Sequence, residues 1–584
     1  MRSNKGQDAM SAAVEDRIRK AAILNAIRHD GKAELQAVLR NLLGDSPELR
    51  SQARDLIPAV REVIDEVNSM PIGQLREVAT ERWPTEISRA KAEEERQLPP
   101  LPHVEKYAMI VTRLAPNPDF VLHLGNARAA ILSHDYARIY KGKFIVRFED
   151  TDPRLKKAQL EYYEKIREDL RWLECDWDEE YIQSDRLPIY YDVAQTLLRR
   201  GAGYVCECDP EQFRAAISAN LACPDRDLSI ELQEKRWQRM VAGEYKEGEA
   251  VFRVKTDLQH PNPAVRDWPA LRIIDTQKAV HPRVGSDFKV WPLYNLASGV
   301  DDHLLGITHI IRGKEHLTNM ERQLYLYNHM GWIYPDAVHY GRLKVEGMNL
   351  SKSKLMKALE TGEVSGVDDP RLGTIAALRR RGYRPETIRR LIWEIGPKPV
   401  DVRISWDNIN SLNRKIVDPI AHRYFFAPDP KQITISRLVR NYDVTIPLHP
   451  QDPDQGIRTL KVHPKGGLAS IFISHSDIQT LQQQKTVRLM GLFNIRLNGE
   501  EGNLNCQYLG ETTENEKTPI IQWVPSEENT TAKVVMPDAT VTTGLAESGL
   551  KSENEGAIVQ FVRFGFCRLD QKAKDAVSVY FAHQ

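Results

Sequence analysis

Two short segments, far apart in the chain, contain side chains that could bind a nucleotide. The first runs from Pro116-Asn117-Pro118 into His123-Leu124-Gly125-Asn126, and the second is Asn349-Leu350-Ser351-Lys352-Ser353. An imidazole, an amide and a glycine at a helix start can approach phosphate groups, and a loop lysine adds a positive charge. Each segment alone is weak evidence, but the ordered pair strongly indicates one nucleotide site.

These residues would suit a reaction at the α-phosphorus of ATP, with Mg²⁺ accompanying the nucleotide. The nucleophile attacks in line, and charge develops on the phosphate oxygens. We expect His123 and Asn126 to donate hydrogen bonds to these oxygens, Gly125 to leave room for the nucleotide, and Lys352 to bring a mobile charge. The alternatives are a satisfied histidine at a helix start and a solvated lysine-serine turn.

The elements around the first segment alternate between strand and helix patterns. The predicted elements are a strand at 107–113, a helix at 125–140, a strand at 144–148 and a helix at 157–172. This order predicts a βαβ unit with a parallel sheet. Ligands of such sheets bind beyond the carboxyl ends of the strands, where Arg113, His123 and Glu149 fall.

The composition changes along the 584 residues, which are too many for one core. The predicted domains are a helical region at 1–100, a nucleotide-binding α/β domain at 101–340 with an insertion at about 203–270, a lysine-serine loop and helical zone at 341–405, and a β-barrel region at 406–584. Among the short strands expected in the last region is one at 486–497. The segment Leu98-Pro99-Pro100-Leu101-Pro102 predicts a stiff extended linker.

Basic and acidic residues balance at 81 each, so the net charge argues neither for nor against a polyanionic partner. Any nucleic-acid surface must therefore be a local patch. The candidates are Lys352, Lys354 and Lys357, followed by Arg379, Arg380, Arg381, Arg384, Arg389 and Arg390. The alternative for the arginine run is a solvated helical face.

The sequence has no apolar run long enough to span a bilayer, and its N-terminal residues are polar. We therefore expect a cytoplasmic protein without a membrane partner.

Six cysteines in so long a chain do not predict a disulfide framework. Cys206, Cys208 and Cys223 nevertheless have a spacing typical of metal sites. A structural zinc site needs a fourth ligand, and the nearby Asp225 and Asp227 are poor substitutes for Cys or His. The sequence thus favours free thiols in the insertion and leaves zinc as the alternative.

Further segments extend these patterns, and together they closely resemble archaeal-type glutamyl-tRNA synthetases, a family of class I aminoacyl-tRNA synthetases. The segments that carry the resemblance are 113–118, 123–128, 144–153, 300–307, 311–316, 413–419 and 561–566. The nucleotide segments resemble the HIGH and KMSKS signatures of this class, with departures at Asn126 and Asn349. The resemblance covers about residues 106–569.

The resemblance implies that Arg113, Glu149, Tyr294 and Arg312 bind L-glutamate. An arginine fork suits a carboxylate, a glutamate suits an ammonium group, and a second arginine suits the second carboxylate. The alternative is that Arg113 and Glu149 pair only with each other or with Asp150.

The resemblance also implies the architecture and the partners. The expected fold is multidomain, α/β plus all-β, with a Rossmann-like class I catalytic domain, an acceptor-end-binding insertion, a helical stem-contact subdomain and a C-terminal β-barrel anticodon-binding region. The expected enzyme is a monomeric ligase that forms glutamyl-adenylate and charges tRNA(Glu), with tRNA(Gln) as a further candidate acceptor.

Two departures concern how phosphates are held. Family members usually have a small pair where this chain has Asp119-Phe120-Val121, so the loop over the nucleotide is expected to differ in shape. The contact usually made by a lysine at position 349 would be lost or supplied by Lys344 or Lys354.

Three rival functions share some of these motifs. A glutaminyl-tRNA synthetase shares most of them, but the amino-acid sequence of segments 116–118 and 123–126 favours a glutamyl-tRNA synthetase. A catalytically silent RNA-binding paralogue would explain Asn126 and Asn349, although Arg113, His123, Glu149 and Lys352 are intact. A short tRNA-modifying relative would lack the C-terminal barrels.

Overall fold

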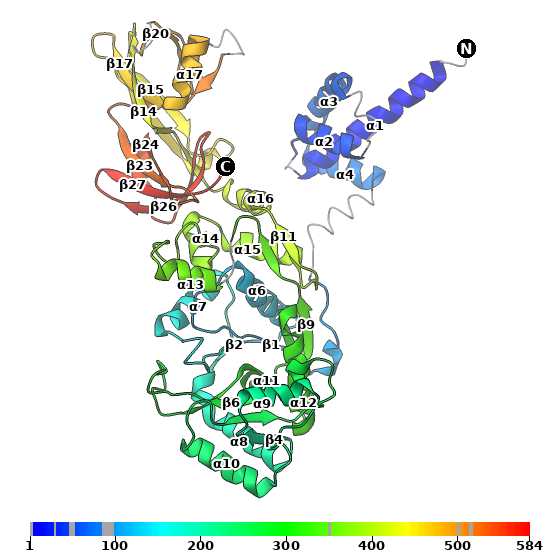
Figure 1. The fold of residues 1–584 in the computed structure, drawn as a ribbon. Coiled ribbons are helices and arrows are strands. Elements are labelled where there is room, and N and C mark those ends of the chain that lie inside the picture. The colour runs from blue at the N-terminus through cyan, green and yellow to red at the C-terminus, as the bar shows by residue number, and fades with distance from the viewer. Residues whose placement is uncertain are drawn as a thin grey trace. The chain divides into compact units, whose positions relative to one another are not determined.

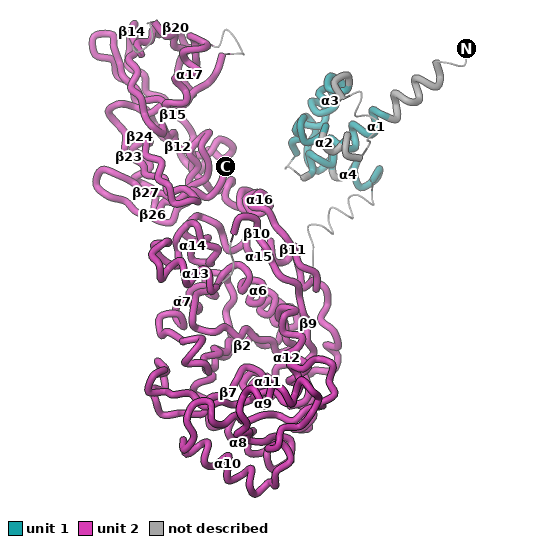
Figure 2. The backbone as a smooth tube through the Cα atoms, viewed as in Figure 1, with its two compact units in different colours: residues 1–97 teal, residues 98–584 magenta. Residues whose placement is uncertain are grey.

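The computed structural model describes residues 4–28, 31–45, 53–83, 98–348, 352–498, 504–512 and 518–584. The chain forms two compact units, residues 1–97 and residues 98–584 (Figure 2). None of the described helices is long and apolar enough to cross a lipid bilayer.

The smaller unit is helical, as predicted. Its described helices are α1 (Asn4–Arg28), α2 (Leu35–Asp45), α3 (Ala53–Asn68) and α4 (Ile72–Arg82). Their apolar faces share one core, in which Ala22, Val38, Val60 and Leu75 are fully buried. The helices are thus stabilised mainly by packing against one another.

The larger unit contains the predicted parallel sheet (Figure 1). Its elements are β1 (Val111–Leu114), α6 (Leu124–Ile139), β2 (Lys143–Phe148), α7 (Leu160–Trp172) and β3 (Glu179–Ile182). A second parallel pair, β8 (His309–Gly313) and β9 (Asp336–Tyr340), lies beside β1, because the Thr308 amide donates to the Val111 carbonyl at 2.9 Å. The predicted first strand begins at Val111 and not at Tyr107, which follows a 3₁₀ turn at Val104–Lys106.

An antiparallel sheet separates β3 from β8 in the chain. Its strands are β4 (Gly203–Cys206), β5 (Val251–Val254), β6 (Pro269–Ile273) and β7 (Val290–Pro292), with helices α8 (Leu187–Arg199), α9 (Pro210–Ser218) and α10 (Ile230–Ala242). Trp237, Trp268 and Trp291 are buried in its core. Helix α11 (Tyr294–Leu304) leads from this sheet to β8, and α12 (Leu317–Met330) connects β8 with β9.

A helical zone follows the parallel sheet. It contains β10 (Leu343–Val345), α13 (Lys352–Glu360), α14 (Ile375–Arg381), α15 (Pro385–Ile395), β11 (Val402–Ile404) and α16 (Trp406–Val417). Arg128 of α6 ties this zone to the sheet, because its guanidinium donates to the carbonyls of Gly341 at 2.7 Å and Gly396 at 2.6 Å.

The C-terminal region forms two sheets that almost close into barrels, which confirms the predicted β-barrel region. The first has the order β12 (His422–Tyr424), β25 (Ile558–Phe561), β26 (Gly565–Lys572), β27 (Ala576–His583), β23 (Asn529–Val535), β24 (Val541–Glu547), β13 (Phe426–Pro428). The second has the order β21 (Ile520–Ile521), β18 (Thr486–Leu489), β19 (Asn494–Leu497), β20 (Asn505–Gly510), β14 (Pro430–Ser436), β17 (Ala469–Ser474), β22 (Val524–Pro525). In each sheet the two outermost strands are neighbours in the chain, so the sheet curves round on itself.

The second barrel carries a hairpin and a helix, namely β15 (Tyr442–Pro447), β16 (Ile457–Val462) and α17 (His475–Gln484).

Two local predictions can be compared with the structure, and the second needs correction. The segment predicted as a stiff extended linker also packs on the larger unit, because Leu98 and Leu101 are buried in its core and the Leu101 amide donates to the Tyr140 hydroxyl. The strand predicted at 486–497 is a hairpin, because the chain turns at Gly491 with a left-handed φ of 71°.

Gly382 tests the junction between α14 and the first barrel. It has a φ of 94°, and an added Cβ would lie 3.0 Å from Arg568 Cβ and from Ile558 Cδ1. We expect Gly382→Ala to destabilise the larger unit by about 1–2 kcal/mol from backbone strain, with a further cost from crowding. Gly331 is the control, because its φ is 72° but an added Cβ would meet nothing. Thermal unfolding should show a larger loss for Gly382→Ala; equal losses would mean that the junction is loosely packed.

Candidate active site

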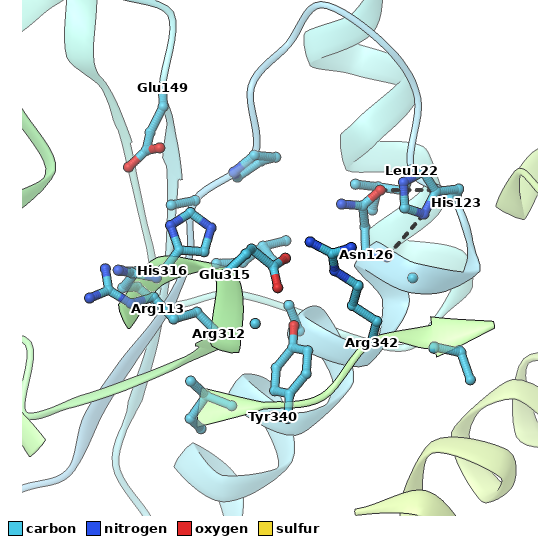
Figure 3. A pocket seen from close by; sticks show the side chains of 18 of the residues that line it. Arg113, Leu122, His123, Asn126, Glu149, Arg312, Glu315, His316, Tyr340 and Arg342 are labelled. Atoms are coloured by element: carbon cyan, nitrogen blue, oxygen red, sulfur yellow. Dashed lines mark hydrogen bonds between the residues drawn. The ribbon is translucent and has the colours of Figure 1, made fainter. Parts of the chain in front are cut away.

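A cavity of about 410 Å³ lies at the carboxyl ends of β1, β2 and β8 (Figure 3). Arg113, Glu149, Tyr294 and Arg312 line one part of it, and the segment that ends β1 and begins α6 lines another. The latter includes Pro116, His123, Gly125 and Asn126. The structure therefore brings together the four residues predicted to bind an amino acid and part of the set predicted to bind a nucleotide.

His123 and Asn126 form a capping box at the start of α6. The His123 Nδ1 accepts from the Asn126 amide at 3.3 Å, and the Asn126 Oδ1 accepts from the His123 amide at 3.2 Å (Figure 3). Burial, with a smaller effect of Lys352, lowers the pKa of His123 to about 4, so the ring is neutral at pH 7. With Nδ1 as acceptor, the proton lies on Nε2. His123 is thus both a satisfied helix cap and a donor in the cavity.

Gly125 lines the cavity, and its missing side chain has a second consequence beside the predicted one. An added Cβ would lie 2.8 Å from His123 Cε1. A side chain at this position would displace the imidazole, so the glycine first makes room for the ring of His123.

Lys352, at the first turn of α13, forms an ion pair with the buried Asp119. Its charge also lowers the pKa of His123, so the two predicted segments share one electrostatic environment. Asn349, Leu350 and Ser351 lie outside the described residues. Lys344, predicted as a substitute phosphate contact, has its Nζ 3.8 Å from an Asp401 carboxylate oxygen.

A buried network holds Arg113. Asp302 of α11 accepts from Arg113 Nε at 3.0 Å and Nη2 at 3.1 Å, and also from Arg147 Nη1 at 2.7 Å. Arg147 donates in turn to Glu149 at 3.0 Å. Burial raises the pKa of Asp302, but Arg113 and Arg147 outweigh it and lower the value to about 2. Arg113 therefore pairs with neither Glu149 nor Asp150, the partners that the alternative interpretation expected.

Arg312 has only neutral partners among the described residues. Its guanidinium donates to the hydroxyls of Tyr334 at 2.9 Å and Tyr294 at 3.3 Å, and to the Gln323 and His339 side chains. Burial, helped by the charge of Arg312, lowers the pKa of His339 to about 4, so this ring is uncharged as well. A guanidinium that is 5% exposed and lacks a carboxylate partner is a site for an anion.

Several residues in or behind the cavity were not predicted from the sequence. They are Asp302 and Arg147 behind Arg113, and Glu315, His316, Tyr340 and Arg342 in the lining. Arg342 is exposed and extends toward Asn126 (Figure 3). Five described residues that were predicted to contact ATP do not line the cavity, namely Asn117, Pro118, Leu124, Lys352 and Ser353. The side chain of Leu124 is buried in the core. The available signal was the acidic pair Asp301-Asp302 in segment 300–307, which was used only for the resemblance.

The cysteines of the insertion form a cluster with Asp225. Cys206 Sγ and Cys223 Sγ are 3.8 Å apart, and the possible ligand atoms of Cys206, Cys208, Cys223 and Asp225 all lie within 4.8 Å of one another. Asp225 also pairs with Arg236 at 2.8 Å. Asp227, the other predicted candidate, is not part of the cluster and faces Lys255 at 3.5 Å.

The arginine run is not a solvated face throughout. Arg381 is buried, and Arg380 pairs with Asp368 and with Asp570 of β26. Arg389 pairs with the buried Asp135. Arg380 and Arg389 thus join α14 and α15 to neighbouring elements. Arg384 and Arg390 lie 3.7 and 3.5 Å from Glu386 and Glu394.

Comparisons with known proteins match both the catalytic part and the barrels. Residues 109–419 match the catalytic domain of class I tRNA synthetases (E and Q), and residues 421–509 and 520–570 match two anticodon-binding domains of the same family. Curated glutamate–tRNA ligases of Pyrococcus furiosus and Thermococcus onnurineus are each 48% identical over 580 residues, covering 98% of this chain and 100% of the relative. A crystal structure of a glutamate tRNA ligase from Elizabethkingia meningosepticum in complex with its amino acid has a TM-score of 0.40 and 23% identity, covering 53% of this chain and 70% of that chain.

The chain therefore belongs to the class I tRNA synthetases of the E and Q family, as its sequence motifs predicted. Within that family, the full-length identity to curated relatives places it among the glutamate–tRNA ligases.

Replacement of Asp302 tests the network behind Arg113. An asparagine offers one acceptor and no charge, so Arg113 loses its fixed orientation. We expect Asp302→Asn to raise KM for glutamate about 100-fold and to leave KM for ATP within about twofold, because breaking a buried ion pair costs a few kcal/mol. Asp301→Asn is the matched control, since Asp301 is equally buried and pairs with Arg186, and more distantly with Arg147 at 3.9 Å, but has no ion pair with Arg113. If both variants raise KM equally, the effect is one of folding and not of Arg113.

Proposed function

We propose that this chain activates L-glutamate with ATP to form glutamyl-adenylate, then transfers glutamate to the 3′-terminal ribose of tRNA(Glu). AMP and diphosphate are released. The curated relatives that match the whole chain are named for this ligase activity. Because charged tRNA supplies translation, we propose the cytoplasm as its location.

The observation that carries the amino-acid assignment is the unneutralised Arg312. Bound glutamate would place its side-chain carboxylate on this guanidinium, with the Tyr294 hydroxyl beside it. Arg113 would hold the other carboxylate through the donors that Asp302 leaves free, and Glu149 would accept from the ammonium group. Each charge of the substrate then meets an opposite charge.

The charge balance also favours glutamate over glutamine. Four guanidinium groups of the site, those of Arg113, Arg147, Arg312 and Arg186, face three carboxylates. These are the buried Asp301 and Asp302 and the partly buried Glu149. The excess of one positive charge matches the single net negative charge of glutamate. Glutamine carries no net charge and would leave Arg312 buried without a counter-ion, which costs several kcal/mol.

The nucleotide would lie at the start of α6. The Nε2–H of His123 and the amide hydrogens of Asn126 would donate to the α-phosphate oxygens, while Lys352 and Arg342 would neutralise the other phosphates. Mg²⁺ enters with ATP as part of the substrate. Because these donors are intact, catalysis is favoured over a silent RNA-binding role.

For the cluster in the insertion we propose a structural zinc ion bound by Cys206, Cys208, Cys223 and Asp225. A tetrahedral zinc site with Zn–S distances of about 2.3 Å places its sulfurs about 3.8 Å apart, the separation between Cys206 and Cys223. Arg236 and the Glu207 amide, which bind the Asp225 carboxylate, would orient this ligand. The ion would hold the segment after β4 and take no part in glutamate activation.

Arg312→Gln tests the amino-acid assignment. In ATP–pyrophosphate exchange with tRNA present, we expect kcat/KM for glutamate to fall about 1000-fold and the preference over glutamine to fall at least about 100-fold, because the carboxylate loses its buried counter-ion. Arg342→Gln, on the nucleotide side, should raise KM for ATP and leave that preference unchanged.

The same assay tests the activity itself. Wild-type enzyme that prefers glutamine would contradict the proposed function, and an Arg312→Gln variant with full glutamate preference would contradict only the residue assignment. Aminoacylation of purified tRNA(Glu) and tRNA(Gln), assayed separately, defines the acceptor.

Metal analysis tests the zinc proposal. Protein purified with zinc in the medium should carry about one zinc ion per chain, and Cys223→Ser should lose it. Cys567→Ser is the control, since Cys567 is a buried thiol of the first barrel. Zinc-free wild-type protein whose Cys206, Cys208 and Cys223 react as ordinary thiols would favour the free-thiol alternative.

A further inference from the structure

Eight arginines among the described residues are almost completely buried. Four of them pair with carboxylates, namely Arg113, Arg147, Arg423 and Arg458. Two others, Arg128 and Arg266, donate to main-chain carbonyls through several nitrogens. The remaining two, Arg312 and Arg381, have no carboxylate partner and at most one main-chain acceptor, and each lines a cavity.

Arg381 is 5% exposed at the end of α14. Its Nη2 donates to the Ala582 carbonyl at 3.2 Å and weakly to the Tyr383 hydroxyl at 3.4 Å, and its Nε has no hydrogen-bond partner. The guanidinium lies over the ring of Trp406, 4.7 Å from its centroid. No carboxylate of the described residues lies within ion-pair distance of Arg381, so its charge is unbalanced.

The cavity beside Arg381 measures about 750 Å³ and lies at the junction of the helical zone and the first barrel. Its walls include Gly347 and Met348 before the lysine-serine loop, Trp406 and Arg414 of α16, and Phe581 of β27. Arg414 is exposed and has no ion-pair partner among the described residues. The acidic side chain of the lining, Asp407, is exposed at its rim.

These features fit a phosphate group carried by a larger ligand. A guanidinium fork matches phosphate oxygens, and an anion would supply the counter-charge that Arg381 lacks. The volume exceeds that of a phosphate alone, and the Trp406 and Phe581 rings offer apolar surface to a ribose or base.

We propose that this cavity binds a backbone phosphate of tRNA, with Arg381 as its buried cation and Arg414 as its outer one. The assignment rests on the proposed function, which requires tRNA. The cavity walls come from the part of the chain matched by the catalytic model and from Met536 and Pro537, which the second anticodon-binding model covers. A tRNA bound to both domains must cross the junction between them, and a phosphate held here would also contact the residues that precede the lysine-serine loop.

The salt dependence of tRNA binding tests this proposal. The affinity of tRNA(Glu) is measured without glutamate or ATP from about 50 to 200 mM KCl, a range in which each lost phosphate contact lowers the slope of log Kd against log salt by about 0.7 to 0.9. We expect Arg381→Gln to lower the slope by one such step and to raise Kd about tenfold at 100 mM KCl. Arg381→Lys should keep the slope, because it keeps the charge.

Arg380→Gln is the matched control. Arg380 crosses the same junction to Asp570, but it does not line the cavity and is already neutralised. The proposal is overturned by an unchanged slope in Arg381→Gln, or by an equal change in Arg380→Gln. A third result would also overturn it. If inorganic phosphate stabilises the wild-type protein but not Arg381→Gln, while both proteins have the same salt slope for tRNA binding, the ligand is a small anion. A wild-type chain that binds no tRNA at all would instead count against the proposed function.

Discussion

The catalytic part of this protein depends on one buried carboxylate, Asp302, shared between two guanidinium groups. Arg113 comes from β1, Arg147 from β2 and Asp302 from α11, so the three ion-paired side chains fix two strands and a helix at the floor of the cavity. Loss of one member would leave uncompensated charge in the interior. The ion pairs also orient Arg113 before any substrate arrives, so little ordering remains to be done when the substrate binds.

At the start of α6, two neutral side chains both cap the helix and line the cavity. His123 and Asn126 each use one polar atom to cap the helix and leave the other free for the cavity. An amide suits this double role because it has an acceptor and a donor on the same side chain. The departure from the common motif at position 126 is therefore compatible with both the helix start and a phosphate contact, and the helix N-terminus adds its own partial positive charge.

The sequence allowed prediction of whatever depends on local pattern. Alternating strands and helices predicted the parallel sheet, and the position of Arg113 and Glu149 at strand ends predicted their common location. Partners from distant segments could not be predicted: nothing near Arg113 indicates that Asp302 of α11 will bind it. The arginine run shows the same limit, because Arg381 looks like one of several solvated charges until the barrel covers it.

The ion pair between Lys352 and Asp119 links the lysine-serine segment to the loop before His123, where this chain departs from the family. Asp119 is 4% exposed, and Phe120 and Val121 beside it pack in one cluster with Leu355 of α13. The loop before His123 thus holds the first turn of α13 through an ion pair and apolar contacts. A buried carboxylate strongly favours a nearby cation, so a phosphate that attracts Lys352 must compete with Asp119. Asp119, in the loop before His123, therefore limits how much of the Lys352 charge is available to the nucleotide, so the two segments act together.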